Sequence, residues 1–123
     1  FIRFLAMGDV SMVYCGRLII AANRIVAPGF IDVHTHDDRV LLAKPTMDMK
    51  ISQGVTSVIV GNCGISLAPL VADNPPPPLD LIAEAGACRY STFDQFLQEV
   101  EYAPPAVNAA FLVGLCAAGI FKR

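Results

Sequence analysis

Two segments indicate the expected fold: Phe30-Ile-Asp-Val-His-Thr-His36 and Val55-Thr-Ser-Val-Ile-Val60. The first predicts a strand over residues 30–36, whose side chains alternate between two faces. The second is apolar and β-branched without polar alternation, which is typical of a strand covered on both faces of a parallel sheet. A third apolar run, Ala106–Val113, predicts another strand.

Helices are predicted between these strands. The first begins at Pro45-Thr46 and ends at Gly54. The second has Thr92 as its N-cap, Gln95 completes a capping box, and Pro104-Pro105 stops it. The order strand, helix, strand, helix, strand indicates an α/β architecture with parallel pairing.

The segment between the second strand and the second helix, residues 64–90, is expected to be a loop with a turn of helix near Leu79–Ala83. It contains four consecutive prolines, Pro75–Pro78, which favour an extended polyproline conformation. A stiff connection is the favoured interpretation over an SH3-type ligand, because the run has apolar flanks and lacks a nearby basic anchor.

Composition excludes several classes. The chain has 123 residues, of which 54% are hydrophobic and 16% charged, as expected of a globular domain. A net charge of -2 without a basic stripe argues against a nucleic-acid partner. No unbroken apolar run reaches the ~20 residues needed to cross a bilayer, so no membrane association is expected. The oligomeric state is not indicated. The four cysteines form no C-x-x-C pair and fit reduced thiols, hence a cytoplasmic location; they are Cys15, Cys63, Cys88 and Cys116.

The only two histidines, His34 and His36, stand two apart on the first predicted strand. This spacing places both rings on one face with Cα atoms ~7 Å apart, so that they can converge on one metal ion. Asp37 and Asp38 follow and make the rim acidic. Two surface histidines on an edge strand would give the same pattern, and the motif alone does not decide between these readings.

Cys63 favours the metal site. Cys63 lies at the carboxyl end of the second strand, and His34 and His36 lie at the carboxyl end of the first. Neighbouring parallel strands are ~4.8 Å apart and have their carboxyl ends on the same side of the sheet. In barrel enzymes that side carries the active site. A thiolate beside two imidazoles suits zinc, although a buried cysteine is more often inert. Asp32 shares the histidine face, either as an orienting group or as a polar residue satisfied at the bottom of a barrel.

These motifs carry a family resemblance. Ile25-Val-Ala-Pro-Gly-Phe-Ile-Asp-Val-His-Thr-His36 resembles the first barrel strand of the amidohydrolase superfamily, and alone it would also fit hydantoinases. With Gly54-Val-Thr-Ser-Val-Ile-Val-Gly-Asn-Cys-Gly-Ile-Ser-Leu-Ala-Pro69 it closely resembles the N-acyl-D-amino-acid deacylase (D-aminoacylase) subgroup. The turn Gly61-Asn-Cys-Gly64 is the more specific signal.

The resemblance implies a partial (β/α)8 TIM-type barrel of about three strand units over residues 25–114. It also implies a remnant of a small β-domain over residues 1–24, and a divergent tail over 115–123. It implies a zinc-dependent hydrolase that cleaves the amide bond of N-acyl-D-amino acids.

The same resemblance places His34 and His36 in one metal position and Cys63 in the adjoining, tighter one. The general acid/base aspartate is expected downstream, so no catalytic residue is assigned in this chain, and the substrate-binding residues are unknown.

Three ligands divided between two positions fill neither, so we expect an incomplete and inactive fragment that binds zinc weakly or not at all. One alternative is another amidohydrolase, such as a hydantoinase-like cyclic amidase that bridges two metals with a carboxylated lysine; Cys63 speaks against it. The other is a non-catalytic interaction module that uses Pro75–Pro78 as a partner surface.

Overall fold

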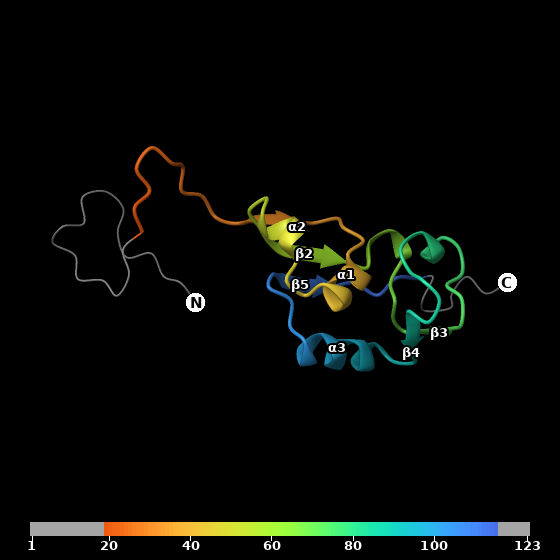
Figure 1. Ribbon diagram of the computed structural model, residues 1–123. Helices are drawn as coiled ribbons and strands as arrows, with labels where there is room; N and C mark the ends of the chain where they lie inside the picture. The colour runs from red at the N-terminus through yellow and green to blue at the C-terminus, as the bar shows by residue number, and fades with distance from the viewer. Residues whose placement is uncertain (1–18, 116–123) are drawn as a thin grey trace.

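A three-stranded sheet joins β1 (Phe30–Asp32), β2 (Val55–Val60) and β5 (Asn108–Phe111) in the order β1-β2-β5. Both neighbouring pairs are parallel, which confirms the predicted pairing. The computed structural model describes residues 19–115, and Figure 1 shows how helices and loops surround the strands. Most of the predicted β-domain remnant (1–24) and most of the predicted tail (115–123) lie outside the described residues.

β2 is the central strand, and its bounds agree with the prediction. It pairs with β1 on one edge and with β5 on the other. One of its faces is fully covered, because Val58 and Val60 are 1% and 0% exposed. They pack in one hydrophobic cluster with three other buried side chains, Leu41, Met47 and Val107. Since all three strands run in one direction, their carboxyl ends open on the same side of the sheet.

β1 is shorter than the strand predicted over residues 30–36. The ladder ends at Asp32, where the carboxylate Oδ1 accepts a hydrogen bond from the backbone N–H of His34 (3.3 Å) and turns the chain. The backbone N–H of Thr35 still donates to the carbonyl of Ile59 in β2 (3.3 Å). His34 and His36 therefore follow the strand in a loop held beside β2, rather than lying on the strand itself.

Two short helices connect β1 to β2 where one was predicted. α1 (Asp38–Ala43) was missed, although its apolar residue Leu41 is fully buried. α2 (Asp48–Ile51) is a single turn that starts later than the predicted Pro45-Thr46 boundary. The chain leaves it through Gly54, whose φ of 79° is the left-handed conformation expected at a helix end.

The long helix α3 (Phe93–Tyr102) confirms the clearest local prediction. The Thr92 Oγ1 accepts from the backbone N–H of Gln95 (3.3 Å), and the Gln95 side chain accepts from the backbone N–H of Thr92 (3.4 Å). This reciprocal capping box satisfies two backbone donors at the start of the helix. The helix ends at Tyr102, two residues before the proline pair, because proline cannot continue the hydrogen-bond ladder.

The predicted loop of residues 64–90 contains an unpredicted antiparallel pair, β3 (Leu70–Ala72) and β4 (Cys88–Tyr90). The turn of helix predicted near Leu79 is present as a 3₁₀ turn over Leu79–Leu81. The proline run bends into that turn, since the backbone N–H of Leu79 donates to the carbonyl of Pro76 (2.8 Å). The extended polyproline conformation predicted for Pro75–Pro78 is therefore wrong at the end of the run.

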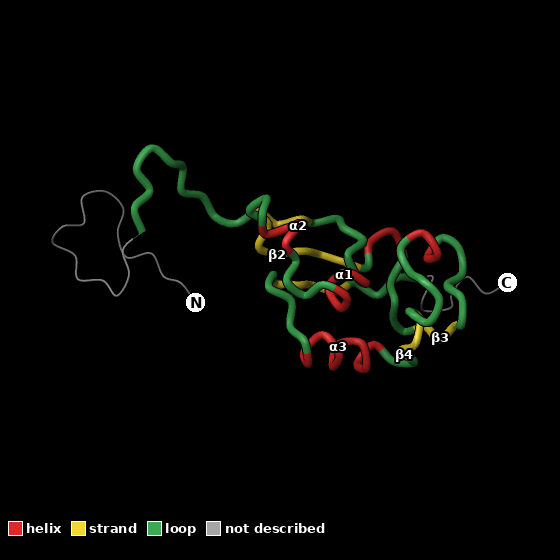
Figure 2. Tube along the Cα trace, viewed as in Figure 1, coloured by secondary structure: helices red, strands yellow, loops and turns green. Residues whose placement is uncertain are grey.

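The described residues form a mixed α/β structure, as predicted. Figure 2 shows helices and strands alternating along the trace. The strands β3 and β4 lie side by side, beyond the carboxyl end of β2. A second hydrophobic cluster fills the space between this pair and α3, and its core includes Leu67, Leu79, Tyr90, Phe96 and Val100. The sheet and the β3–β4 region thus each have apolar support.

Candidate metal centre

His34, His36 and Cys63 come together at the carboxyl ends of β1 and β2. The two histidines lie in the loop that follows β1, and Cys63 lies in the 3₁₀ turn Asn62–Gly64 that follows β2. Parallel pairing of the strands, with Asp32 opposite Val58, brings both loops to the same side. The structure therefore gathers the three residues singled out from the sequence into one cluster.

The donor atoms of this cluster are close enough to share a cation. One ligand atom from each of the three residues lies within 4.8 Å of the other two. His34 Nε2 and Cys63 Sγ are 3.0 Å apart, within hydrogen-bond distance. The two imidazoles meet edge to face, with ring centroids 5.6 Å apart and planes at 75°. Cys63 points toward the rings, so the geometry on which the metal interpretation depended is present.

A strained turn delivers Cys63 to this position. Gly61 and Cys63 both have left-handed backbones, with φ of 82° and 56°. A Cβ on Gly61 would lie 1.9 Å from the carbonyl oxygen of Leu112, so only glycine fits there. Asn62 anchors the turn from the other side, because its amide donates to the carbonyl of Ile59 (2.7 Å). A non-glycine residue in the left-handed region is uncommon and often marks a functional position.

The cluster fits zinc by its donor set and by an unsatisfied atom. Two imidazole nitrogens and one thiolate are preferred zinc ligands. His36 Nδ1 is buried and has no hydrogen-bond partner among the described residues, and such an atom is normally paired with a protein group, water or ion. The donor chemistry and this unsatisfied nitrogen therefore both fit a zinc site.

Asp32 contacts the backbone of His34 and forms no hydrogen bond with a histidine ring among the described residues. Its carboxylate accepts from the His34 backbone and pairs through Oδ2 with the ammonium of Lys50 (2.7 Å). The hydrogen bond from Lys50 holds the pKa of Asp32 below its usual range. Burial works to lower the pKa of Lys50, but its hydrogen bond to Asp32 and its ion pair with Asp37 outweigh burial and raise that pKa.

The two aspartates after His36 have different environments, although both were expected at an acidic rim. Asp37 forms an ion pair with Lys50 (2.9 Å). Asp38 is only 2% exposed, and its carboxylate accepts from the backbone N–H of Gly61 (3.4 Å). Burial raises the pKa of Asp38 to about 6. Asp38 is thus an interior link between α1 and the Gly61 turn and not part of a rim.

Lys50 is the residue near the centre that the sequence did not reveal. It lies on the helix that was predicted between Pro45-Thr46 and Gly54. No local pattern indicated that its side chain would reach back to the loop after β1. Of the two cysteines in residues 19–115, Cys63 is exposed and Cys88 is buried, and both are free thiols. Cys15 and Cys116 lie outside the described residues.

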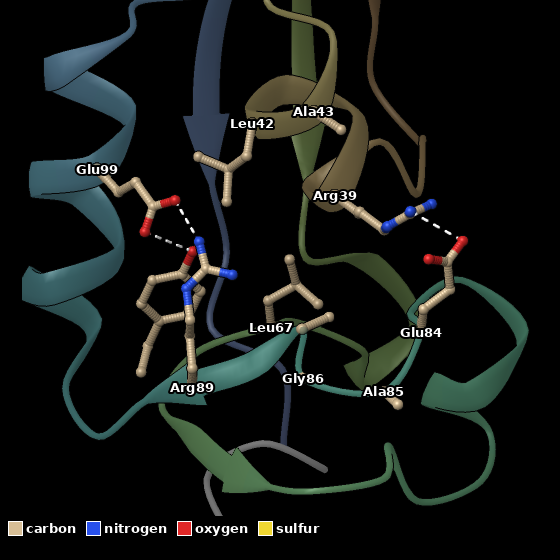
Figure 3. Close-up of a pocket in the computed structure, with 11 residues that line it drawn as sticks. Arg39, Leu42, Ala43, Leu67, Glu84, Ala85, Gly86, Arg89 and Glu99 are labelled. Carbon is tan, nitrogen blue, oxygen red and sulfur yellow. Dashed lines mark hydrogen bonds and ion pairs between the residues drawn. The ribbon is translucent and has the colours of Figure 1, made fainter.

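A separate cavity of about 280 Å³ lies between α1, β4 and α3 and is lined by none of the three ligands (Figure 3). Its charged groups are already paired: Arg39 with Glu84 (2.8 Å), and Arg89 with Glu99. The hydroxyl of Tyr90 donates to Glu99 (2.8 Å), and burial together with this bond raises the pKa of Tyr90 to about 12. The cavity therefore offers no free charge to a ligand.

The model of the amidohydrolase family matches residues 17–86, more than half of the chain, so the chain belongs to this family. Within the family it is similar to D-aminoacylases, as the motifs indicated. It is 52% identical over 112 residues to D-aminoacylase from Alcaligenes xylosoxydans xylosoxydans, covering 91% of this chain and 23% of that enzyme.

Two solved structures extend the likeness to three dimensions. A D-aminoacylase studied for its binuclear metal centre is 54% identical, with a TM-score of 0.85 over 91% of this chain and 24% of its own. N-acyl-D-glutamate deacylase from Bordetella bronchiseptica, solved with zinc and a phosphonate inhibitor, is 41% identical, with a TM-score of 0.70 over 79% of this chain and 20% of its own. The chain spans about a quarter or less of the length of these relatives.

None of the helices described between residues 19 and 115 combines the length and the apolar character required to span a bilayer.

Proposed function

We propose that His34, His36 and Cys63 hold zinc in a hydrolase that cleaves the amide bond of N-acyl-D-amino acids. The observation that carries the proposal is the approach of the three donor atoms to within 4.8 Å of one another at the ends of two consecutive parallel strands. The substrate class rests on the relatives, which are a D-aminoacylase and an N-acyl-D-glutamate deacylase. Zinc rests on the donor set and on the zinc present in the latter structure.

Within this proposal the chain's own residues hold the ion. His34 and His36 supply imidazole nitrogens to one position, and Cys63 supplies its sulfur to the adjoining one. The binuclear metal centre of a related D-aminoacylase supports this division. Bound zinc would supply Lewis-acid activation of the amide carbonyl and of water. The general acid/base aspartate and two further histidine ligands are expected outside residues 1–123.

The same proposal gives the sheet its place in a larger fold. β1, β2 and β5 would be the first three strands of a (β/α)8 barrel, within the boundaries predicted at residues 25–114. Their parallel order supports this assignment, and so does the position of the cluster at the carboxyl ends, where barrel enzymes carry their active sites.

Metal binding by the chain tests the centre directly. With two histidines in the whole chain, both in the cluster, the imidazole NMR signals of the protein report this site alone. We expect added zinc to shift both sets of signals with an affinity weaker than micromolar, because three donors do not complete two coordination shells. Cys63→Ala should weaken binding further, whereas Cys88→Ala, at the other described cysteine, should not. Imidazole signals of His34 and His36 that do not respond to zinc, together with a chimera, described next, that does not bind zinc, would refute the proposed centre.

A chimera tests the reaction. The matching segment of the Alcaligenes D-aminoacylase would be replaced by this chain, and hydrolysis of N-acyl-D-amino acids would be compared with that of cyclic ureides. We expect zinc-dependent deacylation that Cys63→Ala abolishes and Cys88→Ala preserves. Preferential turnover of the ureides would instead favour a hydantoinase-like enzyme. A correctly folded, zinc-loaded chimera without either activity would contradict the proposed function.

A further inference from the structure

The ammonium group of Lys50, on α2, contacts three side chains of one short segment. Its Nζ lies 2.7 Å from Asp32 Oδ2, 3.1 Å from Thr35 Oγ1 and 2.9 Å from Asp37 Oδ2. The contacts with Asp32 and Thr35 are hydrogen bonds, and the contact with Asp37 is an ion pair. The Lys50 side chain is 16% exposed, which makes this an enclosed cluster and not a loose surface pair.

The three partners of Lys50 bracket the two histidines along the chain. Asp32 precedes His34, Thr35 separates His34 from His36, and Asp37 follows His36. Asp32 also accepts a hydrogen bond from the backbone N–H of His34, so Lys50 holds the carboxylate that in turn holds the His34 backbone. The residues on both sides of each histidine therefore contact one atom, the Nζ of Lys50 on α2.

The positive charge of Lys50 balances two neighbouring negative charges. The carboxylates of Asp32 and Asp37 are partly desolvated, with side chains 30% and 13% exposed. Without the ammonium they would repel each other in a medium that screens them poorly, and the loop would open to hydrate them. A polar cluster of this kind adds little net stability but can select one conformation of the chain.

We propose that Lys50 is a positioning residue for the metal centre: it holds the loop after β1 in the shape that aims His34 and His36 at a shared divalent cation. The inference rests on the proposed function in that the cation is the zinc assigned to this site. It adds a residue of α2 that supplies no ligand atom and acts only through Asp32, Thr35 and Asp37.

Zinc titration of the whole 123-residue chain, followed by the two sets of imidazole NMR signals, tests this role. We expect Lys50→Met to weaken zinc binding roughly 10–100-fold, the range found when groups behind metal ligands are removed. Lys50→Arg, which can still donate to both carboxylates, should recover most of the affinity. Lys44→Met is the matched control, because Lys44 is exposed and forms no ion pair within residues 19–115.

The fold of each variant is checked by urea unfolding before zinc is added. A folded Lys50→Met chain with wild-type affinity would overturn the positioning role while leaving the zinc centre intact. If Lys50→Met does not fold, the milder Lys50→Gln decides by the same criterion, and unfolding of both would overturn the role by assigning Lys50 to the fold itself. A wild-type chain whose imidazoles ignore zinc would instead count against the proposed function.

Discussion

The metal centre and the aromatic layer beneath α3 are held in opposite ways. In the aromatic layer, defined by Tyr90, Phe93, Phe96 and Phe111, the ring of Phe96 meets Tyr90 and Phe111 edge to face with centroids 5.4 Å away in both cases. The main stabilising contribution of such packing is the hydrophobic effect, which has no preferred direction and is shared among many contacts. The candidate metal centre depends instead on the left-handed backbones of Gly61 and Cys63 and, in our proposal, on Lys50.

Because of this difference, we expect substitutions in the two regions to change different measured quantities. Loss of a ring from the aromatic layer removes stability and leaves the loops after β1 and β2 with their own contacts. Loss of one polar contact or one glycine at the metal centre costs less stability but displaces ligands whose spacing must be held within tenths of an ångström. Unfolding free energy and zinc affinity are therefore the two measurements that separate the regions.

The largest effect is expected from Phe96→Ala. Phe96 is 2% exposed at the centre of the aromatic layer, and its truncation should cost about 3–5 kcal/mol of unfolding free energy through lost burial and a residual cavity. Urea unfolding measures the loss, and Leu81→Ala, at a side chain that is 82% exposed, is the control. Equal losses in the two variants would show that the layer is not a packed core.

Gly61→Ala should lower both the free energy of unfolding and the affinity for zinc. The new Cβ would meet the Leu112 carbonyl at 1.9 Å, on a backbone with φ of 82°. Strain and displacement together should cost about 2–4 kcal/mol and should weaken zinc binding, because the turn carries Cys63. Gly86→Ala is the matched control: its φ is 78°, but no atom lies within 4 Å of the new Cβ, so only the smaller conformational cost of about 1 kcal/mol applies. Similar behaviour of the two variants would contradict the crowding argument.

The buried Asp38 predicts a pH dependence of stability. Its pKa is raised from 3.8 to about 6 by burial, so the folded chain binds a proton that the unfolded chain has released between these values. In metal-free protein the free energy of unfolding should fall by up to about 3 kcal/mol as pH rises from about 4 to about 6, relative to Asp38→Asn. The comparison is made by urea unfolding in a chelator. Parallel pH profiles for the two proteins would rule out this linkage.

The smallest expected effect is loss of the helix cap. Thr92→Ala removes the side-chain acceptor for the Gln95 backbone N–H and should cost about 1 kcal/mol of unfolding free energy, with zinc affinity unchanged. Thr92→Ser keeps the hydroxyl and should remain close to wild type. A fall in zinc affinity for Thr92→Ala would show that α3 and the metal centre are more strongly coupled than their separate contacts indicate.

Local patterns allowed much of this molecule to be predicted. The strand Val55–Val60 and the capped helix after Thr92 follow from β-branched composition and from a reciprocal side-chain cap, both of which act over a few residues. The pairing of His34 and His36 with Cys63 followed from their places after consecutive strands. By contrast, the pair β3 and β4 joins segments more than ten residues apart with weak patterns, so it was read as a loop.

The sequence alone was enough to predict the candidate ligand residues, the parallel pairing of the strands and the side of the sheet on which these residues meet. These features depend on residue identity and on short-range periodicity, which can be read directly from the sequence. Only the tertiary structure decided that both histidines lie beyond β1, that Asp38 is interior, and that Lys50 ties Asp32 to Asp37. Those outcomes depend on which distant groups share a desolvated space, because burial and charge pairing arise only when separate segments have packed together.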